Sequence, residues 1–105
     1  MRIAFICAPY SGDIEKNTEL HKRICKYAVK QGVIPFAPAI YFTQFLDEND
    51  PKQRALGIEM GLAFMPACDE IWVYGDKTTD GMLQEIMEAG GVLIESKKIT
   101  EEMIG

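Results

Sequence analysis

The sequence contains 105 residues, of which 48% are apolar and 26% charged, so we expect one globular domain built around a single core. Acidic residues outnumber basic ones by 16 to 11, and the net charge of −5 argues against duplex nucleic acid as the main partner. A small nucleotide is not excluded, because it needs only a local pocket. No apolar run approaches the length of a membrane span and no secretory leader opens the chain, which together indicate a cytoplasmic protein.

The cysteines and the single histidine are scattered. Cys7, Cys25 and Cys68 lie in apolar segments and form no CxxC motif, so we interpret them as buried free thiols in a reducing compartment. His21 lies in the middle of a predicted helix, where a packing or surface role is favoured over that of a catalytic base. These residues offer no ligand spacing for zinc, and we expect no metal site.

Strand-like and helix-like segments alternate along the chain. Apolar, β-prone runs predict strands at residues 2–7, 33–37, 70–74 and 92–94. Helical spacing, capping residues and closing glycines predict helices at about 14–31, 50–65 and 81–89, with a last short turn at 100–104. The segment 41–49 is interpreted as a loop or a short helical turn.

This alternation is typical of a parallel sheet with helices on both faces. We predict a single α/β domain spanning residues 1–105, a Rossmann-like or flavodoxin-like three-layer sandwich with four parallel strands in the order 2-1-3-4. In such sheets ligands bind at the carboxyl ends of the strands, where the strand order reverses. The loops after the first and third strands, at 8–13 and 75–82, therefore form the candidate site.

The first loop reads APYSGD. Tyr10 offers a ring and a phenol, Ser11 a hydroxyl and Asp13 a carboxylate. Gly12 permits a tight turn and a close approach of the backbone. The loop opens onto a helix N-terminus, which attracts anions, although an ordinary turn capped by Asp13 explains the same residues. It matches neither GxGxxG nor a Walker A motif, so a dinucleotide or ATP enzyme is poorly supported.

The second loop leads into another helix N-terminus, a natural site for phosphate or ribose. Its candidate binding residues are Thr79, Asp80, Gly81 and Met82. Glu85 follows about one turn into the helix and can point back towards the strand ends, although helices commonly carry solvated glutamates there.

The helix before the third strand carries Glu59 between Gly57 and Gly61. The glycines weaken this helix and invite close packing. Glu59 itself is a solvated surface residue by default. Asp69, at the amino end of the third strand, is assigned a capping or turn role because ligands bind at the opposite end of the sheet.

The segments CAPYSGD and CDEIWVYGD, followed by T-D-G-x-x-x-E-I-x-x-A, resemble the nucleoside 2-deoxyribosyltransferase-like superfamily. The small phage and bacterial domains of this superfamily are the most similar, and the 2′-deoxynucleoside 5′-monophosphate N-hydrolases also share the pattern. The resemblance covers nearly the whole chain. It implies that a glutamate on the last helix attacks the anomeric carbon, that the base leaves, and that another base or water resolves the glycosyl-enzyme.

The resemblance also implies roles for individual residues. Glu85 lies four residues after Gly81, as the family nucleophile follows its glycine. Thr79 stands where the transferases have aspartate and resembles a serine that holds the 5′-phosphate in the N-hydrolases, which favours a nucleotide. The loop of Tyr10, Ser11 and Gly12 resembles the segment that faces the sugar and its 5′ group.

One family feature is missing. The family uses an aspartate on the helix before the third strand to handle the departing base, and no aspartate lies on the body of that helix here. Glu59 is the nearest substitute and is assigned as a candidate general acid. If Glu59 points elsewhere, proton transfer to the base lacks a donor.

The resemblance therefore implies an N-glycosidase or deoxyribosyltransferase that acts on a (deoxy)nucleoside 5′-monophosphate. Glu85 is the expected nucleophile, and no cofactor is needed. The alternative, which the missing aspartate favours, is a binding module that holds a nucleotide or nucleotide-derived signal without turnover, as a phage-encoded sequestering protein would. A structural or regulatory subunit with a vestigial pocket is the third possibility.

We also expect a homo-oligomer, a dimer or larger, because a short sheet has exposed edges and apolar helix faces to cover. Five apolar residues are candidates for the core or an interface, and the core is favoured for each: Met60, Phe64, Met65, Met82 and Met87.

Overall fold

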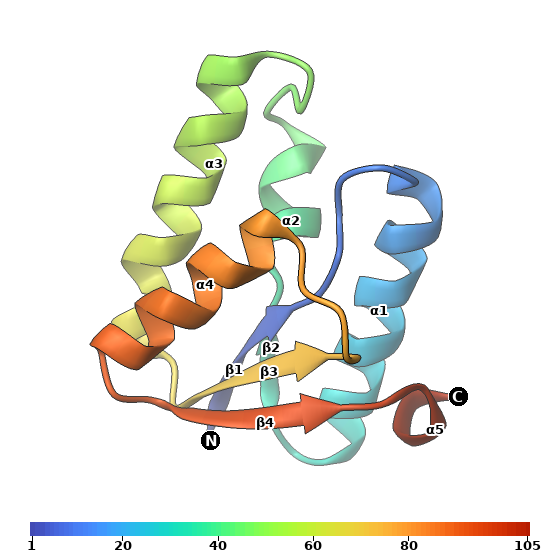
Figure 1. Ribbon diagram of the computed structural model, residues 1–105. Coiled ribbons are helices and arrows are strands. Elements are labelled where there is room, and N and C mark those ends of the chain that lie inside the picture. The colour runs from blue at the N-terminus through green and yellow to red at the C-terminus, as the bar shows by residue number, and fades with distance from the viewer.

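Four parallel strands in the order β2-β1-β3-β4 form the centre of the structure, a computed structural model that describes residues 1–105 (Figure 1). The strands are β1 (Ile3–Cys7), β2 (Ile34–Phe36), β3 (Glu70–Tyr74) and β4 (Glu95–Ile99). The helices are α1 (Ile14–Lys30), α2 (Pro38–Tyr41), α3 (Pro51–Phe64), α4 (Asp80–Gly91) and α5 (Glu101–Ile104), with 3₁₀ turns at Phe42–Gln44 and Met65–Ala67. The predicted α/β architecture and strand order are confirmed.

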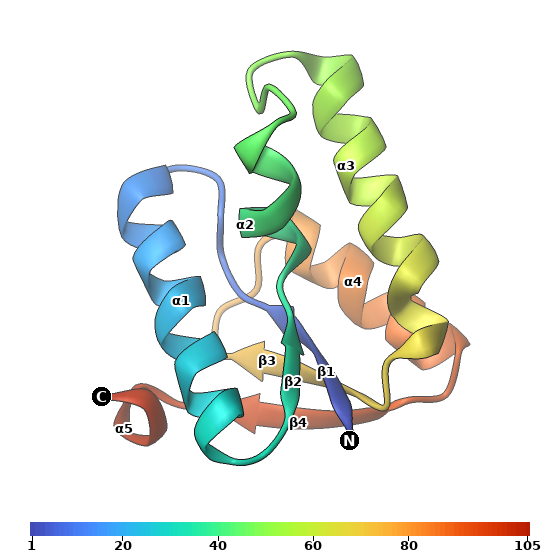
Figure 2. The same cartoon turned by 180° about the vertical axis from the view of Figure 1, so that it is seen from behind.

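Side chains of the central strands alternate between two apolar layers. In β1, Ala4 and Ile6 face α1, where Ile24 and Ala28 are fully buried against them. Phe5 and Cys7 face the opposite layer, which Met65, Met82 and Ala89 complete. Helices α1 and α5 therefore cover one face of the sheet, and α4 with the end of α3 covers the other (Figures 1 and 2). This alternation is the period of two expected for strands buried on both faces.

The predicted fourth strand at 92–94 was wrong. Helix α4 continues through the two glycines at its end, and Val92 N–H still donates to the carbonyl of Glu88. Leu93 turns the chain back with a φ of 60° and is 90% exposed. The actual strand β4 is an edge strand, ESKKI, whose first four residues are exposed. Polar residues protect an exposed sheet edge, and for that reason no apolar run marks this strand in the sequence.

The preference for the core was correct for two of the five apolar candidates. Met65 and Met82 are buried, whereas Met60, Phe64 and Met87 are exposed. Helix α3 carries apolar residues on all sides, and the narrow sheet covers only part of them. Such a helix leaves hydrophobic side chains in contact with solvent unless a partner covers them.

A buried carboxylate at the start of β3 links the residue before β1 to β3 and β4. Glu70 is almost fully buried and accepts hydrogen bonds from Arg2 and Trp72, with Lys97 3.4 Å away. Although burial opposes its charged form, these donors hold the pKa of Glu70 below its ordinary value. Asp69 accepts the Ile3 amide at 2.7 Å, which fits its predicted capping role at this end of the sheet.

None of the helices has the combination of length and apolar character that crossing a membrane would require. The three cysteines are free, with Cys7 and Cys68 buried and Cys25 half-buried.

Candidate active site

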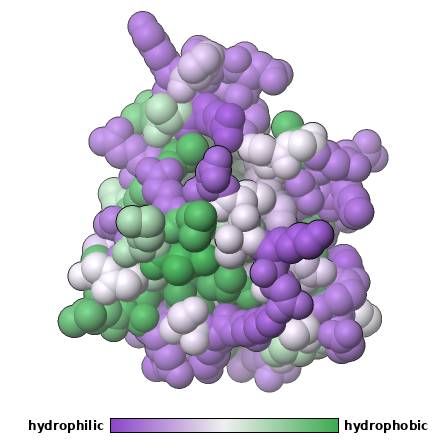
Figure 3. All heavy atoms as spheres, in the orientation of Figure 1, coloured by the Kyte–Doolittle hydropathy of each residue, from purple (hydrophilic) through white to green (hydrophobic).

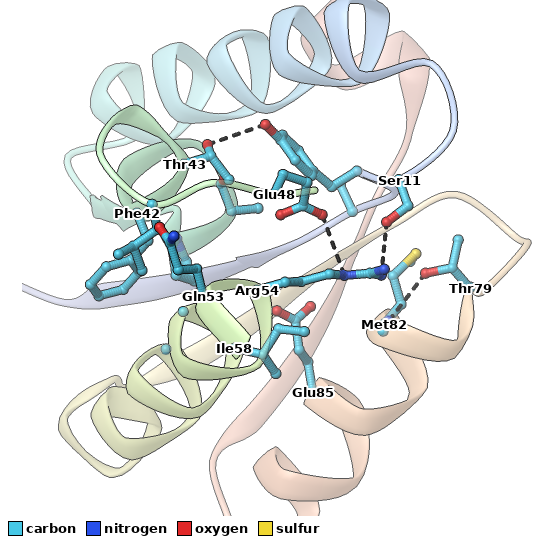
Figure 4. A pocket seen from close by; sticks show the side chains of 18 of the residues that line it. Ser11, Phe42, Thr43, Glu48, Gln53, Arg54, Ile58, Thr79, Met82 and Glu85 are labelled. Carbon is cyan, nitrogen blue, oxygen red and sulfur yellow. Dashed lines mark hydrogen bonds and ion pairs between the residues drawn. The ribbon is translucent and has the colours of Figure 1, made fainter. Parts of the chain in front are cut away.

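A cavity of about 320 Å³ lies at the carboxyl ends of β1 and β3 (Figure 4). The β1–α1 loop and the first turns of α4 form one side of it. Helix α2, the segment leading from it to α3, and one face of α3 form the other side. The volume falls within the range of small-molecule sites, and the position is the one predicted from the reversal of strand order.

Glu85 lies in this cavity, one turn into α4. Its carboxylate points away from the α4 backbone into the space beneath α3 (Figure 4). The side chain is half-buried, and burial raises the pKa of Glu85 to about 7, while a hydrogen bond from Cys7 opposes that rise. A carboxyl group with such a pKa exists in both protonation states near neutral pH, as catalytic carboxyl groups commonly do.

The start of α4 is fixed by its own cap and by the core. Thr79 accepts a hydrogen bond from the Met82 amide at 3.2 Å, and the Met82 side chain is buried in the core. The buried thiol of Cys7 lies 3.7 Å from the Met82 carbonyl oxygen. The position of Glu85 is therefore set by a helix whose first turn is held from both the loop and the sheet.

The β1–α1 loop is held across the cavity to the segment after β2. Tyr10 donates a hydrogen bond to the Thr43 hydroxyl at 3.1 Å, and Thr43 in turn donates to the carbonyl of Ala39 at 2.6 Å. Below the loop, the buried His21 ring lies 3.1 Å from the carbonyl oxygen of Pro9 and packs edge-on against Tyr10. His21 thus has the packing role that was favoured for it, and it supports a loop that lines the cavity.

The structure brings seven of the ten candidate residues to one cavity: Tyr10, Ser11, Thr79, Asp80, Gly81, Met82 and Glu85. Gly12 and Asp13 do not line it. Gly12 makes the turn with a φ of 99°, and Asp13 caps α1 through the Lys16 amide, as in the ordinary turn considered above.

Glu59 is the third candidate outside the cavity. The α3 residues that line it are Gln53, Arg54, Gly57, Ile58 and Gly61, a stripe with helical spacing. Glu59 is exposed and lies beside a shallow depression between α3 and α4, together with Leu62 and Gln84. The structure therefore does not bring Glu59 to Glu85.

Sequence reasoning missed Arg54 and Glu48. The guanidinium of Arg54 donates to the Ser11 hydroxyl at 3.0 Å, and its Nε lies 3.4 Å from a carboxylate oxygen of Glu48 (Figure 4). Arg54 shares the stripe of Gly57 and Gly61, so helical spacing from these two glycines could have identified it. Glu48 lies in an irregular segment, where no periodicity indicates which way a side chain points.

Two solved structures share this fold. A 2-deoxyribosyltransferase from the psychrotolerant bacterium Bacillus psychrosaccharolyticus has a TM-score of 0.74 and 10% identity over 93% of this chain and 72% of that chain. A 2-deoxyribosyltransferase from Leishmania mexicana has a TM-score of 0.63 and 15% identity over 95% of this chain and 65% of that chain. The chain therefore has the α/β fold of the 2-deoxyribosyltransferases.

The family of the chain follows from its sequence. Residues 2–99 match the family described as "Domain of unknown function (DUF7768)", and the chain belongs to this family. No curated protein matches the chain.

Proposed function

We propose that the protein is an N-glycosidase or deoxyribosyltransferase that cleaves the base–sugar bond of a (deoxy)nucleoside 5′-monophosphate or of the corresponding nucleoside, with Glu85 as nucleophile. Residues 1–105 act in this proposal as one deoxyribosyltransferase-like domain. The observation that carries the proposal is the half-buried Glu85, with its pKa raised to about 7, in a cavity of nucleoside size at the carboxyl ends of the strands. The fold shared with two 2-deoxyribosyltransferases supports it.

The chemistry follows from the properties of a buried carboxylate. The ionised Glu85 attacks the anomeric carbon, the bond from that carbon to the base breaks, and its electron pair leaves with the base. The transition state resembles an oxocarbenium ion, which the negative charge of Glu85 stabilises. Water or a second base then opens the glycosyl ester and releases the carboxylate. The proposal needs no metal or cofactor.

The hydroxyls and backbone around Glu85 suit a sugar. Tyr10 and Ser11 approach from the β1–α1 loop, and Thr79 and Gly81 approach from the first turn of α4. The N-terminus of α4 opens into the cavity beside Thr79, and this arrangement supports the expectation that a 5′-phosphate is held there.

A binding module without turnover is the second candidate, because Glu59 lies outside the cavity and no other carboxylic acid of α3 replaces it. Release of free base from nucleosides and nucleotides separates the two functions. We expect the wild-type protein to release base and Glu85→Gln to lose that activity. Binding of a nucleotide without any release would favour the second function.

We also propose that the protein forms a homo-oligomer. Leu83 and Met87 of α4 are 46% and 75% exposed. Between α4 and α3 lies a shallow depression, which α3 lines with the apolar residues Ala55, Ile58 and Leu62. We call these apolar residues the α3–α4 face. Exposed apolar surface of this kind is typical of protein interfaces, and a monomeric mass in solution would overturn the proposal.

A further inference from the structure

Arg54 is the only cationic residue among those that line the cavity. Its guanidinium is held from two sides, by Ser11 in the β1–α1 loop and by Glu48 in the segment before α3. The side chain is nevertheless 49% exposed, so several of its five N–H groups remain free to face a ligand. Arg54 is therefore a fixed donor with unused hydrogen-bonding capacity.

The other donors on this side of the cavity are already occupied. Gln53 donates one N–H to Asp50 and accepts the Asp47 amide, which fixes its side-chain amide within its own segment. The Thr43 hydroxyl donates to the Ala39 carbonyl. Arg54 thus provides most of the free side-chain donors of the wall formed by the α2–α3 segment and α3.

This wall lies across the cavity from Glu85. Figure 4 shows Glu85 rising from α4 and Arg54 reaching from α3 towards Ser11, with Phe42 on the left of the view. In a displacement at the anomeric carbon, the nucleophile and the leaving group occupy opposite faces of that carbon. A base that leaves from Glu85 therefore departs towards the wall that carries Arg54.

The charge around Arg54 favours an uncharged ligand there. Asp47 and Glu48 also line this wall, and Glu48 already pairs with the guanidinium. A dianionic phosphate at this wall would meet carboxylates with no unpaired cation to offset them. A neutral base with two adjacent acceptor atoms matches the fork of a guanidinium without that repulsion.

We infer that Arg54 determines base specificity by binding the acceptor edge of a leaving 6-oxopurine, O6 and N7 of hypoxanthine or guanine. As the bond from the anomeric carbon to N9 breaks, its electron pair spreads over the purine, and the guanidinium stabilises that charge before water protonates the base. Arg54 thus stabilises the leaving base by its charge, whereas a general acid, which α3 lacks, would do so by donating a proton. This inference rests on the proposed function, and adenine, which presents an amino donor beside N7, is disfavoured.

The test compares 2′-deoxyinosine with 2′-deoxyadenosine. The base of the first carries an oxygen at position 6 and a proton on N1, whereas the base of the second carries an amino group at position 6 and no proton on N1. We expect wild-type kcat/KM to be higher for 2′-deoxyinosine by about tenfold or more, since a bidentate contact of this kind discriminates on that order. Arg54→Met should abolish the preference, and Arg54→Lys, which keeps the charge without the fork, should lose most of it. Arg23→Met is the matched control, because Arg23 pairs with Glu101 far from the cavity. Melting temperatures of all variants report whether each one folds.

Three results would overturn the inference. The first is equal cleavage of the two substrates by the wild-type protein. The second is a preference that survives Arg54→Met. The third is a loss confined to the 5′-monophosphates of the same nucleosides, which would make Arg54 a phosphate ligand.

If the wild-type protein releases base from no substrate, the proposed function fails, and calorimetry with free hypoxanthine and adenine tests the inference by itself. Tighter binding of hypoxanthine that depends on Arg54 supports it, and equal binding overturns it.

Discussion

At the scale of single residues, the environment of Glu85 decides what the site can do. Burial raises its pKa to about 7, and the Cys7 thiol beneath it donates a hydrogen bond that limits the rise. The same burial, together with the neighbouring carboxylate, raises the pKa of Cys7 far above its ordinary value, so the thiol remains a neutral donor. The neutral thiol has one proton, which it can donate to Glu85 or to the Met82 carbonyl oxygen.

This environment predicts how activity depends on pH. Because the nucleophile is the ionised form and the pKa of Glu85 is raised, kcat/KM should increase with pH through a midpoint near 7 and level off above it. Cys7→Ala removes the hydrogen bond that stabilises the ionised form, so the midpoint should move to higher pH. Initial rates of base release between about pH 5 and about pH 9 provide the measurement. Activity that falls as pH rises through 7 would instead indicate that protonated Glu85 acts as an acid.

The sequence could predict the residues of short local motifs but not those brought in by tertiary structure. Thr79, Gly81 and Glu85 lie within the first two turns at the start of α4, so their spacing alone places them close together. Arg54 reaches the cavity only because α3 packs against α2 at the edge of the site. Glu59 follows Ile58, which lines the cavity, but one further residue of helical rotation turns Glu59 away from it. The register of a helix that is apolar on all sides could not be determined from its own sequence.

At the scale of elements, the approach of α3 to α2 sets the shape of the cavity wall. A Cβ atom at position 61 would lie 3.0 Å and 3.2 Å from the ring carbons of Pro38, which opens α2. At position 57 it would lie 3.5 Å from Leu46 and 3.6 Å from Phe42, which is ordinary contact. Gly61 is thus the position where α3 needs a glycine, in line with the close packing expected from the sequence.

The two glycines form a matched pair for a stability measurement. Gly57→Ala should stabilise the protein by up to about 1 kcal/mol, because alanine favours the helix. Gly61→Ala should instead destabilise it by about 1 to 2 kcal/mol, because the methyl group forces α2 away from α3. Chemical denaturation of both variants gives the free energies of unfolding. A Gly61→Ala protein as stable as Gly57→Ala would show that α2 shifts freely.

Strands and helices could be predicted from the sequence where an apolar run or a capping residue identified them. The apolar runs of β1 and β3 and the cap Asp50 gave correct positions for two strands and one helix. The position of strand β4 was not predicted. It depends on pairing with β3, and the exposed lysines and glutamate of β4 carry no apolar pattern.

At the scale of the whole molecule, the main unexplained feature is the α3–α4 face, whose exposed apolar residues Leu83 and Met87 remain in contact with solvent in a single chain. Figure 3 shows hydrophobic residues gathered on the side of the molecule that α4 covers. The opposite layer differs, since α1 is amphipathic and presents mostly polar residues to solvent. The proposed self-association therefore places this layer in the interface.

A substitution on each layer tests this directly. We expect the wild-type protein to sediment as a dimer or larger and Met87→Glu to shift it towards the monomer, because a charge in an apolar interface loses its hydration. Val29→Glu is the control, since Val29 is a 65% exposed apolar residue on α1. A wild-type protein that remains monomeric at high concentration would contradict the expectation, as would equal effects of the two variants.

The central claim is that Glu85 performs glycosidic cleavage, and release of free base tests it most directly. Ribo- and deoxyribonucleosides and their 5′-monophosphates are incubated with the wild-type protein, Glu85→Gln and Glu88→Gln, and the products are separated by chromatography. Glu88 is an exposed glutamate on the same helix and serves as the control. We predict release by the wild-type protein and by Glu88→Gln, and a loss of about 100-fold or more in Glu85→Gln. Undiminished release by Glu85→Gln, or no release by the wild-type protein from any substrate, would contradict the claim.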